Sequence, residues 1–114
     1  MKGTERQVAW AEDIRELKIE CAQNSGTVLF GAMFFDWCQL KGIDWKQELV
    51  QFANSLDDAK YWIDSRNNER FYFDFKEHIG YTEDEQYRFS VSEEYSEIRK
   101  ARRQARRKSS KEGE

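Results

Sequence analysis

The chain has no proline among its 114 residues and only one histidine, His78. Proline is the residue that most strongly interrupts a helix, because it lacks a backbone N–H group and clashes with the preceding turn. Its absence therefore allows long helices. A single histidine excludes a catalytic pair of histidines and a metal site with several histidine ligands. These absences favour a mainly helical protein, and we expect no metal ion and no cofactor.

Cysteine is also scarce, with only Cys21 and Cys38 present. They do not form a C-x-x-C pair, and no N-terminal signal peptide precedes them. This usage is typical of a reduced, cytoplasmic protein in which both cysteines are small buried side chains. The most apolar run, residues 28–37, is about half as long as a membrane-spanning helix requires. We therefore expect no membrane segment.

Catalytic motifs are missing as well. The acidic runs 83–85 and 93–94 match neither a general acid–base pair nor a calcium-binding loop. The scattered glycines form neither G-x-G-x-x-G nor G-K-S/T, so no phosphate-binding loop is predicted. We expect a protein that is not an enzyme and has no catalytic residue.

Aromatic residues, in contrast, are abundant: four Trp, five Tyr and eight Phe. Each can bury on the order of 150 to 250 Å² of surface. Disordered chains are poor in such residues, whereas a chain of this length can form one core. The aromatic content therefore predicts a folded body despite a charged fraction of 36%.

Helical signals open the chain. Thr4 and Gln7 fit a capping box, and 24–26 is expected to end the helix that follows. Between them, apolar residues recur at the spacing of one helix face. The residues expected on this buried face are Val8, Ala11, Ile14, Leu17 and Cys21.

Three further helices are predicted before residue 69. A largely buried helix is expected over 27–40, because that stretch is apolar on nearly all sides. Asp44 is placed to cap the next helix. The segment 55–58 fits a second capping box, and the helix after it should stop at 67–68.

Residues 70–92 fit two patterns. Phe71, Phe73 and Phe75 alternate with polar residues, as in a β-hairpin. However, Phe71, Tyr72 and Phe75 also share one face of a helix. We favour helix for 69–79 and keep a hairpin over 70–92 as the alternative. Either way, the sequence predicts a small bundle of four to six helices.

Charge divides the chain unevenly. Residues 99–114 hold eight bases against two acids, net +6, whereas residues 1–98 hold eleven bases and twenty acids, net −9. A last helix, capped by Ser90 or Ser92, is predicted to cross this boundary with acids at its start and bases towards its end, as the helix dipole favours. We thus expect an acidic, aromatic-rich helical domain over 1–98 and a projecting basic helix with a frayed tail over 99–114.

This basic helix is the leading candidate for a binding site. It presents bases on nearly all sides, which suits contact with phosphates, and its five arginines against three lysines favour bidentate contacts. We predict a partner that is nucleic acid or a nucleoprotein, bound without sequence specificity; a tail that only aids solubility or folds back on the acidic body is the alternative. The predicted nucleic-acid-binding residues are Arg99, Lys100, Arg102, Arg103, Arg106, Arg107 and Lys108.

Two blocks of the sequence resemble small uncharacterised proteins of bacteria and their phages. Residues 3–15 follow the pattern G-S/T-E-K/R-Q-I/V-x-W-A-E-x-I-R, and 59–66 are similar to A-K-x-W-I-D-N-R, with Ser65 in place of the usual Asn. Together the blocks cover about a fifth of the chain. The resemblance implies a prokaryotic or phage origin and brings no activity with it.

The same blocks contain a candidate surface cluster of Trp10, Arg15, Trp62 and Arg66. Arginine guanidinium groups can stack on indole rings and form a shared surface. Alternatively, both tryptophans fill the edge of the core, while the arginines cap helix ends or pair with acids. The sequence leaves both interpretations open.

A rival function follows from the acidic body and the phage resemblance. In this hypothesis the chain is an anti-defence inhibitor or adaptor, comparable to anti-CRISPR proteins, that binds a basic host protein. A third possibility is a structural subunit that forms homo-oligomers through residues 69–91, so the oligomeric state stays open. The protein-binding residues of the rival hypothesis are Glu83, Asp84, Glu85, Glu93 and Glu94.

Overall fold

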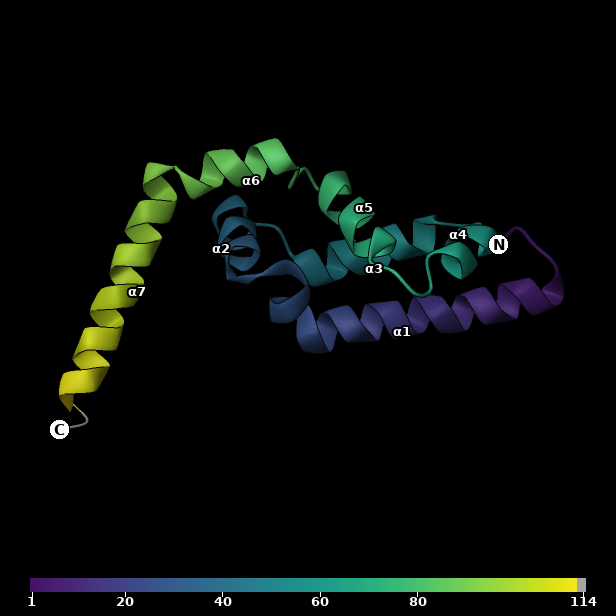
Figure 1. Cartoon of the computed structure of the whole chain (residues 1–114), viewed down its shortest axis with the longest axis horizontal. Helices are drawn as coiled ribbons and strands as arrows, with labels where there is room; N and C mark the ends of the chain where they lie inside the picture. Colours follow the sequence, from purple (N-terminus) through teal and green to yellow (C-terminus); the bar gives the residue numbers. More distant parts are fainter. Residues whose placement is uncertain (113–114) are drawn as a thin grey trace. The chain divides into compact units, whose positions relative to one another are not determined.

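The computed structural model describes residues 1–112, with side chains described as far as Arg107. Within this range the chain forms seven α-helices and no strand (Figure 1). The predicted helical bundle is confirmed, with one helix more than expected. The helices are α1 (Glu5–Phe30), α2 (Ala32–Lys41), α3 (Trp45–Ser55), α4 (Ala59–Asp64), α5 (Arg70–His78), α6 (Glu83–Ser90) and α7 (Glu93–Glu112).

The chain divides into two compact units, Met1–Tyr81 and Thr82–Glu114. The first contains α1 to α5 and the second contains α6 and α7. Ten bases and fourteen acids give the first unit a net charge of −4, and nine bases and eight acids give the second +1. The change from acidic to basic sequence at residue 98 lies inside α7 and does not coincide with the boundary between the units.

Helix α1 begins where the sequence predicts and ends later. Thr4 and Gln7 form the capping box, with the Gln7 N–H donating to Thr4 Oγ1 at 3.2 Å. The helix was expected to end at 24–26, but it kinks at Ser25 and continues to Phe30. The reason lies in Gly26, where a Cβ atom would come within 3.0 Å of the Trp45 ring. This glycine permits close packing rather than ending the helix, and the break falls at Gly31, whose φ is +83°.

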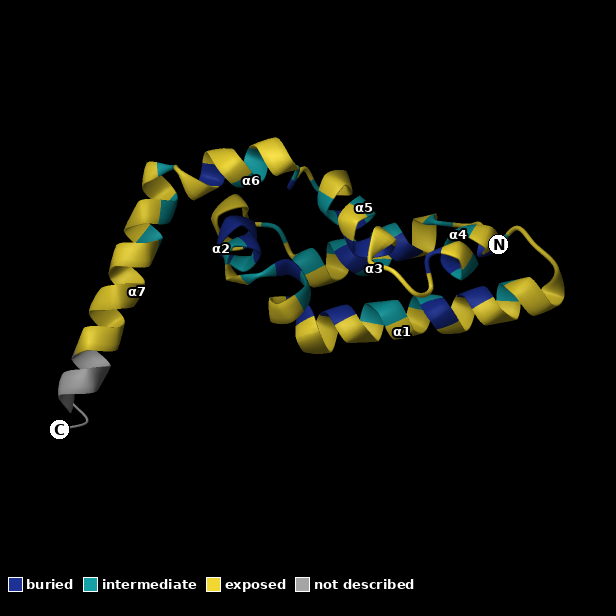
Figure 2. Ribbon diagram, in the orientation of Figure 1, coloured by how far each residue is buried: buried dark blue, intermediate teal, exposed yellow. Residues whose placement is uncertain are grey.

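Aromatic side chains form the core of the first unit. Buried positions lie on the faces that α1 to α5 turn towards one another (Figure 2). Among them, Phe34, Trp62, Phe71 and Phe75 are fully buried. The Phe30 ring joins them, with its centroid 4.8 Å from that of Phe34. The buried indole N–H of Trp62 does not lack a partner, since it donates to the Leu56 carbonyl at 3.0 Å. This core holds α1, α4 and α5 in fixed positions and so fixes the surfaces between them.

Residues 70–92 form α5 and α6, so the helical interpretation is confirmed and the hairpin is not formed. Phe71, Tyr72 and Phe75 lie on the buried face of α5, whereas Phe73 is half exposed. In a hairpin all three Phe side chains would share one face. Burial of the helical set therefore decided between two patterns that the sequence fits equally well.

Three local predictions need correction or selection. Asp58, not Ser55, caps α4, accepting from the Lys60 N–H at 3.0 Å. Of the two serines proposed to cap α7, Ser92 does so, accepting from the Tyr95 N–H at 3.2 Å. Cys38 is buried as expected, but Cys21 is exposed.

Candidate functional site

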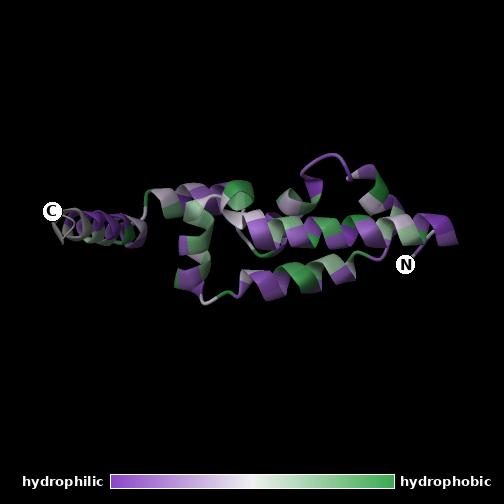
Figure 3. Ribbon diagram, turned by 90° about the horizontal axis from the view of Figure 1, so that it is seen from below, coloured by the Kyte–Doolittle hydropathy of each residue, from purple (hydrophilic) through white to green (hydrophobic). Residues whose placement is uncertain are grey.

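Helix α7 carries the basic residues predicted to bind nucleic acid. Its first turns pack against α6, where the rings of Phe89 and Tyr95 lie 4.9 Å apart. Beyond Ile98, which is half-buried, every described side chain from Arg99 to Arg107 is exposed. Hydrophilic residues dominate this helix in Figure 3. The basic part of α7 is therefore an exposed surface, and its helical conformation fixes the order of its charges.

Four arginines gather on one face of α7. At about 100° per residue, positions 99, 102, 103 and 106 fall within an arc of about 100°, together with Tyr95. They line a shallow groove of about 300 Å³, and the Arg99 guanidinium lies over the Tyr95 ring at 5.7 Å. We call this surface the arginine face; its residues are Tyr95, Arg99, Arg102, Arg103 and Arg106.

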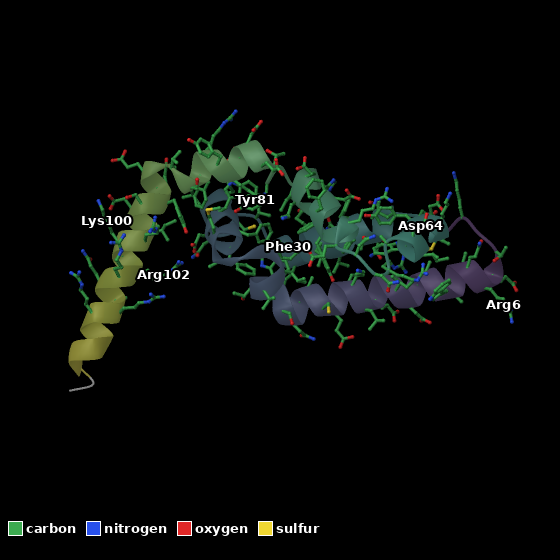
Figure 4. All side chains as sticks on the ribbon, viewed as in Figure 1. Arg6, Phe30, Asp64, Tyr81, Lys100 and Arg102 are labelled. Atoms are coloured by element: carbon green, nitrogen blue, oxygen red, sulfur yellow. The ribbon has the colours of Figure 1, made fainter. Side chains whose placement is uncertain are left out.

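On the opposite side of α7, no base is found among the side chains described as far as Arg107. Helical spacing places Glu94, Glu97, Ala101, Gln104 and Ala105 there. The described bases, as far as Arg107, occupy about half of the circumference. Helical spacing places Lys108 on the other half, so the expectation that bases point nearly all round stays a prediction. Lys100 and Arg107 stand at the edge of the basic half, and Figure 4 shows Lys100 and Arg102 on different sides of the helix. Lys100 also pairs with Glu97 at 3.7 Å.

Lys108 was part of the predicted set, but its side chain lies outside the described residues. The structure thus separates the other six predicted bases into two groups. Arg99, Arg102, Arg103 and Arg106 belong to the arginine face, whereas Lys100 and Arg107 flank it.

The acids of the rival hypothesis all occupy helix N-termini. Glu83, Asp84 and Glu85 form the first turn of α6, where Thr82 Oγ1 accepts from the Glu85 N–H at 3.2 Å. Glu93 and Glu94 form the first turn of α7. A carboxylate in such a position is stabilised by the helix dipole. Residues 82–98 hold six acids against one base, so the second unit contributes −5 of the −9 assigned to the acidic body.

The two sequence blocks, residues 3–15 and 59–66, come together in the first unit. Helix α1 packs against α4. The Lys2 N–H donates to the Asp57 carbonyl at 2.9 Å, and the Ala59 N–H donates to the Lys2 carbonyl at 2.9 Å. A Cβ atom at Gly3 would lie 3.0 Å from Ala59 Cβ, so this close approach requires a glycine. The paired blocks thus form a structural joint.

The predicted surface cluster at this joint is only partly formed. Arg66 lies over the Trp10 ring at 5.1 Å and donates to the Ile63 carbonyl at the end of α4. Trp10 is 47% exposed, but Trp62 is fully buried and is a core residue. Arg15 is half-buried. Trp62 therefore does not belong to a surface cluster, because the α4 face that carries it packs into the core.

A second concave surface, which the sequence did not predict, lies in the first unit. It is a groove of about 620 Å³ between α1, the connection 65–69 and α5. We call it the α1 groove. Its lining residues are Ile14, Leu17, Lys18, Cys21, Leu29, Arg66, Asn67, Asn68, Glu69 and Tyr72.

Several residues that line the α1 groove were expected elsewhere from the sequence pattern. Leu17 and Cys21 were expected in the core, but Leu17 is 65% exposed and Cys21 is exposed as well, whereas Lys18 is half-buried. Lys18 Nζ donates to the Asn68 carbonyl at 2.6 Å, and its own carbonyl accepts from the Tyr72 hydroxyl at 2.9 Å. No local signal predicts this arrangement, because it depends on how the connection 65–69 meets α1.

Several titratable groups in the first unit are shifted by burial. Burial raises the pKa of the Cys38 thiol and of the Tyr72 hydroxyl to about 12 in each case, and nearby Cys21 and Glu69 add to the effect at Tyr72. Burial lowers the pKa of Lys18, while Cys21 and Glu69 oppose that change. The pKa of Tyr61 is raised by burial and by its hydrogen bond to Asp74, 2.7 Å long.

His78, the single histidine, stacks on Phe52 with ring centroids 4.4 Å apart. In the part of the chain that the structure describes, no three His, Cys, Asp or Glu side chains gather closely enough to hold a metal ion. None of the described helices combines the length and the apolar character needed to cross a membrane.

Comparisons with protein-family models, with curated proteins and with solved structures found no match to this chain.

Proposed function

We propose that this chain is a small, non-enzymatic protein that binds nucleic acid, or a nucleoprotein, through the arginine face of α7. One observation carries the proposal: four exposed arginines lie on a single helix face, with no acid among the residues that line their groove. Guanidinium groups make bidentate contacts with phosphates, and each neutralised phosphate releases a counterion. Such a face attracts a polyanion irrespective of sequence.

The dimensions of the arginine face suit a nucleic-acid backbone. Arg99 and Arg106 are seven residues apart, which is about 10 Å along the helix axis. A helix with its side chains is about 10 to 12 Å wide, close to the width of the major groove of B-DNA. In this proposal the face that carries Ala101 and Ala105 points to solvent, so no acid meets the phosphates.

Binding without sequence specificity is part of the proposal. In this proposal the four arginines contact phosphates, so an amide side chain such as Asn or Gln would have to read the base edges. Gln104, the one amide among the described residues of α7, lies on the side opposite the arginine face. The partner is therefore recognised through its backbone charge.

Fluorescence anisotropy with labelled mixed-sequence DNA and RNA tests the proposal. A variant in which the four arginines are changed to glutamine keeps good helix formers in α7 and removes four charges. Its matched control removes four exposed bases of the first unit, Lys2, Arg6, Lys41 and Lys60, in the same way. We expect the first variant to lose binding and the control to keep it. Equal loss in both variants, or no binding by the natural chain, overturns the proposal.

The rival function, an anti-defence inhibitor or adaptor that binds a basic host protein, has one observation in its favour. Tyr87 and Val91 are 70% and 66% exposed. At helical spacing they share an arc of about 100° with the exposed acids Glu83 and Asp84. An exposed face that combines aromatic, aliphatic and acidic groups suits a basic protein partner.

This rival is tested by charge reversal. Glu83→Lys with Asp84→Lys should abolish capture of a basic host protein and leave nucleic-acid binding intact. Capture that persists in this double variant contradicts the rival hypothesis. The four-arginine variant supplies the converse control, since it leaves the α6 face unchanged.

A further inference from the structure

The α1 groove, which the proposed function does not use, is formed entirely within the first unit. Its volume of about 620 Å³ lies within the range of 300 to 1,000 Å³ that is usual for small-molecule sites. Ile14, Leu17, Leu29 and the Tyr72 ring supply its apolar surface. Leu17 is 65% exposed although it lies on the helix face that the apolar pattern assigns to the core. This side chain is therefore left open to contact a bound molecule.

The net charge of the groove lining has the opposite sign to the net charge of the first unit. The first unit is net −4, but the charged residues that line the groove are Lys18, Arg66 and Glu69, net +1. Lys18 also lies over the Tyr72 ring at 5.5 Å. Within residues 1–107, no carboxylate lies within ion-pair distance of its ammonium group. Its hydrogen-bond partner is a neutral carbonyl and its ring partner is Tyr72, while the Glu69 carboxylate acts on it electrostatically from the same groove.

Such an ammonium group has unused binding capacity. A lysine carries three N–H donors, and one of them is directed to the Asn68 carbonyl. Partial burial has removed some of its water, which strengthens its interaction with an incoming anion. Arg66 adds a second positive charge at the same rim, although Trp10 and the Ile63 carbonyl hold its guanidinium in place.

We propose that the α1 groove binds a small carboxylic acid with an apolar body, the carboxylate at Lys18 and the hydrocarbon against Ile14, Leu17 and Leu29. A medium-chain fatty acid or an aryl-substituted short acid has this chemistry. A free peptide C-terminus has it as well, but such an end is usually held by backbone N–H groups. In the connection beside the groove, the N–H groups of Asn68 and Arg70 already donate to Ser65 and to the Asn68 side chain.

Cys21 gives a direct readout, because its exposed thiol lines the groove. Cys38 is 2% exposed and has a raised pKa of about 12, so it should not react with a maleimide in the folded chain. Octanoate, added below its micellar concentration at pH 7, should slow maleimide labelling of Cys21 in a saturable manner. Octanol has the same chain without the charge and should need at least about tenfold more, because a charge-assisted hydrogen bond contributes about that factor or more.

Two pairs of variants locate the effect. Lys18→Met should remove the difference between octanoate and octanol, and Lys18→Arg should keep it. Leu17→Ser should weaken protection by octanoate severalfold, whereas Val28→Ser, a change at an 86% exposed position of α1 outside the groove lining, should not. Leu17 and Val28 are both largely exposed, so these two variants should fold, and thermal melting followed by circular dichroism checks all four.

Three results overturn the proposal. The first is no protection of Cys21 by octanoate in the natural chain. The second is equal protection by octanoate and octanol, which reduces the groove to an apolar surface. The third is protection only by a short peptide that ends in a free leucine carboxylate and not by octanoate, which assigns the groove to a peptide end. Loss of nucleic-acid binding in the arginine variants leaves this inference untouched, because the two sites share no residue.

Discussion

The salt dependence of nucleic-acid binding is the sharpest test of the arginine face, because it counts phosphate contacts. The four arginines on this face predict contact with about four phosphates. The logarithm of the binding constant should then fall with the logarithm of the salt concentration with a slope of about −3.6 on duplex DNA. Between 50 and 200 mM salt, this slope corresponds to a loss of affinity of about 150-fold.

A single substitution refines the count. Arg103→Gln removes one base from the arginine face and should change the slope to about −2.7, which reduces the loss over the same salt range to about 40-fold. Lys60→Gln, at an exposed position of the first unit, should leave the slope unchanged. Anisotropy titrations of one labelled duplex at five salt concentrations give each slope directly.

The same measurement distinguishes the arginine face from the larger set of bases that the sequence suggests. If all seven predicted bases contacted phosphates, the slope would be about −6. Lys100 is paired with Glu97 and stands at the edge of the face, so we expect Lys100→Gln to change the slope less than Arg103→Gln does. A slope near −6, or equal effects of these two variants, refutes binding through one face. A slope near zero refutes binding through phosphates altogether.

Three further predictions concern stability. Trp62→Ala should destabilise the chain by about 3 to 5 kcal/mol in urea denaturation, because it empties a fully buried site; an effect below about 1 kcal/mol would contradict the core assignment. Thr4→Ala should cost about 1 kcal/mol through loss of the capping box, whereas Thr27→Ala, at an exposed position within α1, should cost less. Stability should fall as the pH rises from about 10 to about 12, since burial raises the pKa of Tyr72 to about 12 and the unfolded chain therefore loses its proton first. The Tyr72→Phe variant should lose less stability over this pH range than the natural chain does. An identical loss of stability in both proteins would show that ionisation of Tyr72 is not its cause.

Local signals in the sequence predict the helices well. The capping box of Thr4 and Gln7, the Asp44 cap and the apolar spacing of α5 all depend on residues within one or two turns of each other, and all are confirmed. The predicted boundary between the first two helices was wrong, because it depends on tertiary packing. The segment at Gly26 has the composition of a turn, but that glycine is used for close packing against Trp45.

Surfaces were predicted less well than helices, because exposure depends on what packs against a face. The stripe from Val8 to Cys21 correctly places Ala11 and Ile14 in the core, yet Leu17 and Cys21 on the same stripe are exposed. The uncovered stretch forms a groove only because the connection 65–69 folds alongside it. By contrast, the arginine face can be predicted from the sequence. Once a helix is assumed, the spacing of positions 99, 102, 103 and 106 places these four residues on one side of it.

The position of the charge boundary inside α7 gives the arginine face a direction. Glu93, Glu94 and Glu97 precede Arg99 on the same helix, and α6, which packs against the start of α7, adds three more acids. Because one helix carries both signs, its acidic start cannot move independently of its basic part. If the proposed function holds, a phosphate backbone that approaches the arginine face should be repelled at the α6 end and attracted towards Arg103 and Arg106. Bound nucleic acid should extend beyond the C-terminal half of α7. In a chain that carries Cys21→Ser, a fluorophore on Gln104→Cys should respond to it more strongly than one on Glu94→Cys.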